Sequence, residues 1–286
     1  MKVFLYTIFA LVAFAFNSIL CRLALRGEEI DPASFTGIRL AAGAVTLIVI
    51  SYFVGSPHVG KGLRRANIRA GSWPSAFFLF AYAICFSLAY LSLTAGTGAL
   101  ILFSSVQLTM IVVSLIRGER PRPLEWFGLA LAVGGLVYLV FPGLASPPLV
   151  SSLLMAAAGA AWGLYTLRGK RSGDPLANTT GNFVRTLPFI LLAIIPFLSQ
   201  IHLSNRGVIL AVLSGSIASG IGYTVWYAAL KHHTATRAAV LQLAVPVITA
   251  CIGVLFLAEA ANTRLFIAAA LILGGIGLTI LSREKK

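Results

Sequence analysis

The chain has 286 residues, of which 58% are hydrophobic and only 10% are charged, and its mean hydropathy is +0.93. These values exclude an ordinary soluble domain, which needs charged residues over its outer face, and they indicate an integral membrane protein. The net charge of +14 does not indicate nucleic acid as a partner, because the basic residues are scattered through short loops.

Ten apolar spans follow one another along the chain, each long enough to cross a hydrocarbon core of about 30 Å as a helix. They cover 3–23, 34–54, 73–93, 98–116, 124–141, 149–168, 177–198, 207–230, 237–257 and 264–281. The first is expected to be a spanning helix and not a cleaved signal, because it ends in Cys21-Arg22 without a small-residue cleavage pattern. The three cysteines all lie inside spans, so neither a disulfide framework nor a metal site is expected.

The basic residues fall mainly on one side of these ten spans. If the N-terminus is cytoplasmic, the segments on that side carry sixteen lysines and arginines, and the opposite side carries four. Cytoplasmic loops of membrane proteins are enriched in these residues. We therefore expect a multi-pass membrane protein with both termini in the cytoplasm.

The second half of the chain repeats the first at a shift of 140 residues. Residues 98–137 match 238–277, with Glu119 answering Glu259 and Gly134-Gly135 answering Gly274-Gly275. The opening segments agree as well, since Asp31-Pro32 followed by Arg39 answers Asp174-Pro175 followed by Arg185. An odd number of spans in each copy reverses the second copy in the membrane. The sequence thus predicts two inverted five-helix repeats, 1–143 and 147–286, around a central cavity.

The chain at this point resembles the drug/metabolite transporter superfamily, in its ten-helix branch of tandem EamA-type domains. The resemblance rests on Gly118-Glu119-Arg120 after the fourth span, the double glycines, the Arg39 span and the stretch 160–165. In the second copy Ala258 and Ala260 flank the acid, so that motif is weaker there. The resemblance implies an all-α membrane protein that exports small metabolites, with exporters of amino acids, including aromatic ones, among the similar members.

Charged residues inside the membrane would indicate the type of substrate and coupling. All eight acids fall in loops or at span ends, so no buried carboxylate is expected, and a facilitator is favoured over a proton-coupled exporter. Arg39 and Arg185 lie within spans and could act as charge sites. Both also lie near span ends, where an arginine stem can lie in lipid while the guanidinium reaches the interface, so we favour a snorkelling or packing role.

Neutral polar and aromatic residues provide the candidate substrate site. Asn17, Ser104, Gln107 and Gln242 lie in apolar spans and must face protein or water, either to line the cavity or to bond between helices. The aromatic candidates are Tyr82, Tyr90, Trp162, Tyr165 and Tyr223, whose rings would suit bulky apolar side chains. Trp226 and Tyr227, at the end of the eighth span, are expected to lie at the membrane interface.

Two helices carry features that favour movement. The eighth span contains the small-residue run 214–222, including Gly220, and Pro246 lies near the middle of the ninth span. Proline removes a backbone donor and favours a bend. We expect Gly220 and Pro246 to act as hinges, while the fifth and tenth spans stay packed through their double glycines.

The sequence therefore predicts a transporter, with no catalytic residues, no cofactor and no metal. It would export amino acids or similar zwitterionic metabolites by alternating access through a central cavity, in contact with lipid, with a monomer as the simplest assembly. The alternative within transport is a proton-coupled exporter of lipophilic cations. An integral-membrane enzyme or a lipid scramblase is the alternative from another class.

The topology can be tested by labelling single sites from either side of the membrane. Residues 61 and 283 should both react from the cytoplasmic side, because an even number of spans separates them. Reaction from opposite sides would contradict the inverted repeat.

Overall fold

The structure is a computed structural model that describes residues 2–54, 70–116, 118, 123–141, 143, 146–169, 174–230, 232–233, 241–260 and 262–284. Within these ranges the protein is a bundle of helices. The Glu119-Arg120 motif and the basic residues of 61–69 lie outside the described residues.

The first half contains five helices in a row. They are α1 (Lys2–Arg26), α2 (Pro32–Val54), α3 (Trp73–Ala89), α4 (Ala95–Ile116) and α5 (Pro123–Val140). The second half contains α6 (Leu149–Gly169), α7 (Pro175–Ile194), η1 (Ile195–Gln200), α8 (Asn205–Leu213), η2 (Ser214–Ile221), α9 (Gly222–Leu230), α11 (Ala244–Leu257) and α12 (Thr263–Glu284). Because α8, η2 and α9 form one continuous span, the eighth expected span is confirmed.

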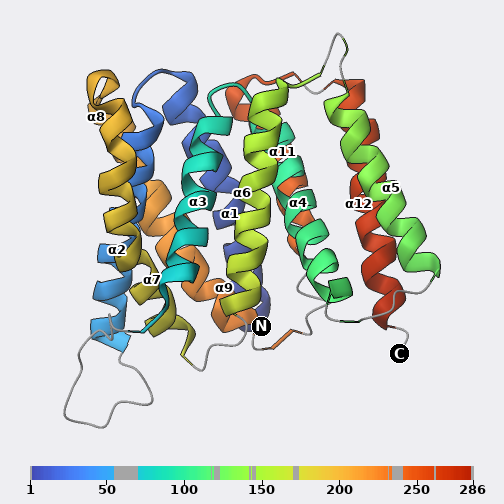
Figure 1. Ribbon diagram of the computed structural model, residues 1–286, viewed down its shortest axis with the longest axis horizontal. Coiled ribbons are helices and arrows are strands. Elements are labelled where there is room, and N and C mark those ends of the chain that lie inside the picture. The colour runs from blue at the N-terminus through green and yellow to red at the C-terminus, as the bar shows by residue number, and fades with distance from the viewer. Residues whose placement is uncertain are drawn as a thin grey trace.

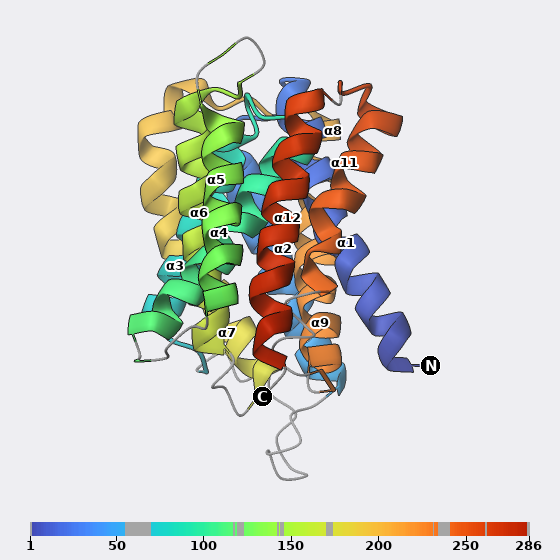
Figure 2. The same ribbon diagram turned by 90° about the vertical axis from the view of Figure 1, so that its right-hand side faces the viewer.

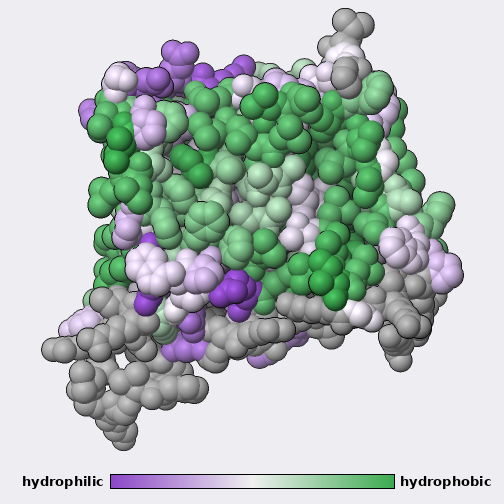
Figure 3. Space-filling model, in the orientation of Figure 1, coloured by the Kyte–Doolittle hydropathy of each residue, from purple (hydrophilic) through white to green (hydrophobic). Residues whose placement is uncertain are grey.

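Among the described residues, seven helical spans are long and apolar enough to cross a membrane, and three shorter apolar helices accompany them. The expected all-α membrane architecture with ten spans is thus confirmed. A broad hydrophobic band crosses the surface, with hydrophilic residues along its upper and lower edges (Figure 3). The first helix begins and the last helix ends at the same end of the bundle (Figures 1 and 2). We call this the termini end.

The same capping chemistry starts the second helix of each half. Asp31 accepts a hydrogen bond from the Ser34 amide at 2.9 Å, and Asp174 accepts one from the Ala177 amide at 3.1 Å. In both cases proline follows, and its fixed φ and missing N–H suit the first helical position. The repeated Asp-Pro motif therefore marks the start of α2 and of α7.

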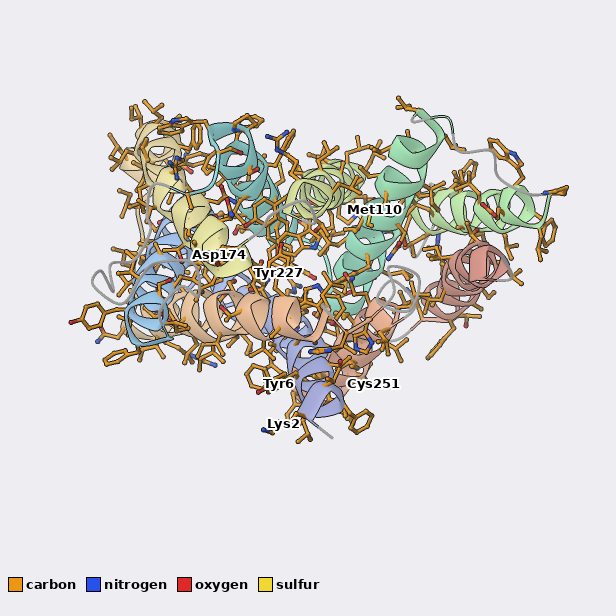
Figure 4. The ribbon with its side chains drawn as sticks, turned by 90° about the horizontal axis from the view of Figure 1, so that it is seen from below. Lys2, Tyr6, Met110, Asp174, Tyr227 and Cys251 are labelled. Carbon is orange, nitrogen blue, oxygen red and sulfur yellow. The ribbon has the colours of Figure 1, made fainter. Side chains whose placement is uncertain are left out.

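The fifth helix of each half packs against its counterpart, so α5 and α12 lie side by side at one edge of the bundle (Figures 1 and 4). A Cβ added to Gly128 would lie 2.5 Å from the Gly275 carbonyl oxygen, and one added to Gly135 would lie 2.7 Å from Leu271 Cβ. A Cβ at Gly134 or Gly274 would meet nothing within 4 Å. Only one glycine of each pair is therefore at the contact, and Gly128 is a further one.

This contact predicts different effects of glycine substitutions on one helix. Gly128→Ala should lower the melting temperature in detergent by roughly 2–10 °C, because the new methyl group overpacks the contact with α12. Gly134→Ala is the matched control and should leave stability unchanged or slightly raised, since alanine favours helix. Equal effects of the two substitutions on the melting temperature would contradict this account of the contact.

Candidate substrate site

Polar and aromatic side chains from both halves meet inside the bundle. This central cluster consists of Asn17, Arg39, Tyr82, Trp162, Ser214, Ser219 and Tyr223, all buried. Asn17 on α1 joins the halves, because its Nδ2 donates to the Tyr82 hydroxyl at 3.1 Å and its Oδ1 accepts from Ser214 Oγ at 2.7 Å. The cluster brings together five of the residues expected from the sequence: Asn17, Arg39, Tyr82, Trp162 and Tyr223.

Arg39 does not snorkel, and that part of the sequence interpretation is wrong. Its side chain on α2 is 1% exposed, its Nη2 donates to the Tyr82 hydroxyl at 3.0 Å and its Nε donates to Ser219 Oγ at 3.3 Å. An arginine in the membrane interior costs about 2.5–3.5 kcal/mol on insertion scales, so it needs partners or a function. The partners come from α3 and η2, which only the fold brings to α2.

A stretch of π-helix explains how two serines of the eighth span reach this cluster. In η2 the backbone bonds i to i+5, so residues five apart lie near one face, whereas an α-helix would turn them well apart. Ser214 and Ser219 are five apart, and they bond Asn17 and Arg39 respectively. Gly215 permits the close approach, because a Cβ there would clash with the Arg39 carbonyl oxygen. In the sequence this run is recognisable only by its small residues.

Aromatic rings surround the polar centre. The Trp162 ring lies 4.9 Å from that of Tyr82 and 4.8 Å from that of Tyr223, between centroids. The rings leave a cavity of about 20 Å³, lined by Phe14, Asn17, Ser18, Tyr82, Phe86, Leu102, Phe103, Trp162 and Tyr223. Such a volume holds about one water, so the site is closed around its centre in this conformation.

Several expected site residues lie elsewhere. Tyr90 ends α3 and donates to the Ala95 carbonyl, Ser104 bonds back to Leu100 within α4, and Gln107 and Gln242 are buried outside the cavity lining. Trp226 is 4% exposed and its ring centroid lies 5.8 Å from that of Phe14, so it does not face lipid as an interfacial belt residue would. Arg185 donates to the carbonyls of Ala70 and Gly181, which is a packing role.

The two expected hinges lie at irregular backbone. Gly220 is inside the π segment, where an added Cβ would lie 3.3 Å from Thr46. Pro246 is in the first turn of α11 and not in the middle of a continuous helix, because the helix is interrupted at Leu243. A proline in a first turn costs no backbone hydrogen bond, and its ring blocks helix continuity with the preceding residues.

A polar cavity opens near the termini end. This vestibule of about 570 Å³ is lined by Gly71, Ser72, Ser75, Phe78, Val113, Leu164, Leu167, Arg168, Gly169, Asn178 and Asn182. Arg168 donates to Ser75 Oγ at 3.0 Å. Helix α6 reaches both cavities, because Trp162 lines the central one and Arg168, nearer its C-terminal end, lines the vestibule. Tyr165, between them along the helix, is buried. An apolar hollow of about 430 Å³ between α4, α11 and α12 has no comparable polar groups.

The opposite end is closed by an ion pair that the sequence did not predict. Arg22 Nε lies 3.3 Å from Glu259 Oε1, and both residues are 9% exposed. Arg22 Nη1 donates to the Tyr90 and Leu91 carbonyls, and Glu259 Oε2 accepts from the Ala95 amide at 2.8 Å. The expectation of no buried carboxylate is thus wrong for Glu259, and also for Glu125, which is 6% exposed in the first turn of α5.

A second contact at this end joins the loop between α1 and α2 to the segment between η1 and α8. Ile30 and Leu203 form an antiparallel bridge, and Ser204 donates to a Glu29 carboxylate oxygen. Within the described ranges no group of three or more potential metal ligands occurs. The ion pair and the bridge both join the first half of the chain to the second at this end of the bundle.

These features define a multi-pass membrane protein with a transporter architecture. The profile of the EamA-like transporter family matches residues 1–141 and again 149–281, and the chain belongs to this family. The repeat boundaries 1–143 and 147–286 remain a prediction. A solved crystal structure shares the fold with a TM-score of 0.68 at 21% identity, covering 99% of each chain.

Curated relatives cover nearly the whole chain. An uncharacterized protein of Pseudomonas aeruginosa is 46% identical over 99% of this chain and 96% of its own length. The Escherichia coli protein named "Probable amino-acid metabolite efflux pump" is 24% identical over 94% of this chain and 91% of its own. The threonine/homoserine exporter RhtA of Salmonella typhimurium is 26% identical over 87% and 82%.

The buried ion pair predicts non-additive effects on stability. Glu259→Ala should destabilise the protein by about 3–5 kcal/mol, because it leaves the Arg22 guanidinium buried without its carboxylate. The double variant Arg22→Leu/Glu259→Leu should be less destabilised, since no charge is then left unpaired. Melting temperatures in detergent report the stability of both variants.

Arg206→Ala is the control for this pair. Arg206 lies 3.5 Å from Glu29, but its side chain is 67% exposed, so its loss should cost about 1 kcal/mol or less. If Glu259→Ala were as mild as Arg206→Ala, the ion pair would not hold this end of the bundle closed.

Proposed function

We propose that this protein exports amino acids or similar small metabolites across the bacterial inner membrane by alternating access. Both termini lie in the cytoplasm in this proposal, as the distribution of basic residues indicates. The vestibule is then the cytoplasmic entrance, and the Arg22–Glu259 pair closes the periplasmic end. The names of two relatives, a probable amino-acid metabolite efflux pump and a threonine/homoserine exporter, support the substrate class.

The observation that carries the proposal is the central cluster itself. Polar side chains in a membrane protein are expensive unless they bond one another or serve a solute, and they mark substrate pathways. Here they come from helices of both halves and surround a small cavity, and helix α6 contributes to the walls of both this cavity and the vestibule. A site between two halves is where alternating-access transporters bind their substrates.

An exporter of lipophilic cations fits this site less well. Arg39 places a positive charge beside the cavity, and no described carboxylate forms an ion pair with it. A cationic drug would therefore meet a like charge in a medium of low dielectric constant. The absence of a carboxylate from the described part of the cluster also favours a facilitator over proton coupling.

Transport can be measured with the purified protein in proteoliposomes. Aromatic and aliphatic amino acids should be taken up without an imposed pH gradient, and Trp162→Ala should reduce uptake about ten-fold or more, since it removes a ring of the site. Trp126→Ala is the matched control, because Trp126 is 51% exposed on α5. No uptake of any amino acid by the wild-type protein would contradict the proposed function, and strict dependence on a pH gradient would contradict the facilitator.

A further inference from the structure

The guanidinium of Arg39 keeps one donor group free. Nε and Nη2 are bonded to Ser219 and Tyr82, but Nη1 is buried and has no hydrogen-bond partner among the described residues. No described carboxylate balances the charge, since the buried Glu259 is held by Arg22 and the Ala95 amide. A buried and unbalanced cation with a free N–H group favours an anion as its missing partner.

The cation lies directly behind the wall of the central cavity. Its Cζ is 5.2 Å from the centroid of the Tyr82 ring and 5.1 Å from that of Phe86, and both rings line the cavity. At this distance, in the low dielectric constant of a membrane protein, the charge acts strongly on any group that enters the cavity.

The hydroxyl of Tyr82 carries the donor character of Arg39 to the cavity surface. Its oxygen accepts hydrogen bonds from both Arg39 and Asn17, so its own proton remains to be donated. These two bonds polarise the hydroxyl and strengthen it as a donor, which suits a carboxylate oxygen. Tyr223 lines the same cavity.

The remaining wall is apolar. Phe14, Leu102, Phe103 and Trp162 would surround the body of a substrate, and neither they nor the polar residues of the described wall supply a carboxylate for an ammonium group. Asn17 Oδ1 already accepts a bond from Ser214. The site therefore offers a positive charge and hydrogen-bond donors to an anionic group, but no described carboxylate to a cationic one.

From this geometry we infer that the site selects monocarboxylates with an apolar or aromatic body, and that it holds the carboxylate through Arg39 and the Tyr82 hydroxyl. This inference rests on the proposed function, in which the cluster is the substrate site. It narrows the preferred substrates from amino acids and similar small metabolites to monocarboxylates. A carboxylate without an ammonium group brings the net charge of the site to zero. A zwitterionic amino acid is accepted, but it leaves its ammonium group without a charged partner.

Direct binding to the purified, detergent-solubilised protein tests this without relying on transport. Phenylpropanoate, phenylpropanamide, phenylalanine and phenylethylamine share a phenyl-alkyl body and differ in charge, and intrinsic fluorescence or a thermal shift reports their affinities. Phenylpropanoate should bind about ten-fold or more tightly than its neutral amide and more tightly than phenylalanine, and phenylethylamine should bind weakest. Equal affinity for the acid and the amide, or preference for the amine, would overturn the inference.

Variants separate recognition of the carboxylate from structural support. Arg39→Gln should reduce the ratio of acid to amide affinity to about one, because it removes the charge, whereas loss of structure alone would weaken both ligands equally. Arg39→Lys should keep part of the ratio. Arg185→Gln is the control, since that arginine donates to backbone carbonyls of α7 and the segment before α3, and its ratio should match the wild-type protein. An unchanged ratio in Arg39→Gln would overturn the assignment of Arg39.

The two proposals fail in different ways. Selective binding of carboxylates without any uptake into proteoliposomes would contradict transport while leaving the anion site in place. Uptake of amino acids together with equal binding of acids and amides would leave transport in place and contradict the anion site.

Discussion

A bilayer offers no water to a polar group, so every polar side chain inside this bundle depends on another part of the protein. The buried guanidinium of Arg39 imposes this constraint most strongly. Its partners come from α3 in the first half and from the π segment of the second, and Asn17 ties the same two regions together. The helices are thus held in register at the centre by a few hydrogen bonds, since apolar contact between helices competes with equally apolar lipid.

This constraint also determines how the two ends differ. At the end of the bundle away from the termini, Arg22 and Glu259 pair with each other and bond three backbone groups. That end can therefore close without leaving a charge unpaired. At the termini end Arg168 bonds to serines around a polar vestibule. The distribution of satisfied polar groups differs between the two ends, and this is the asymmetry that the proposed alternating-access cycle would reverse.

One irregular part of the backbone lies where this network is formed, because the π segment of the eighth span turns Ser214 and Ser219 toward α1 and α2. A second irregularity, the break at Leu243 before Pro246, lies at the start of α11. By contrast, α5 and α12 are regular helices that pack through single glycines. The contact at the edge of the bundle is thus between regular helices, whereas the central cluster includes a π segment, a feature that is frequent at functional sites.

Sequence alone determined the membrane class and the ten spans, because length and hydropathy are local properties. It also supplied most of the central cluster, since asparagine, arginine and tyrosine in apolar spans must face protein. It could not determine that Arg39 is buried, that Arg22 pairs with Glu259 across 237 positions, or that Ser219 faces Arg39. Those facts depend on which helices pack together and on a local change of helical pitch, and only the tertiary structure decides them.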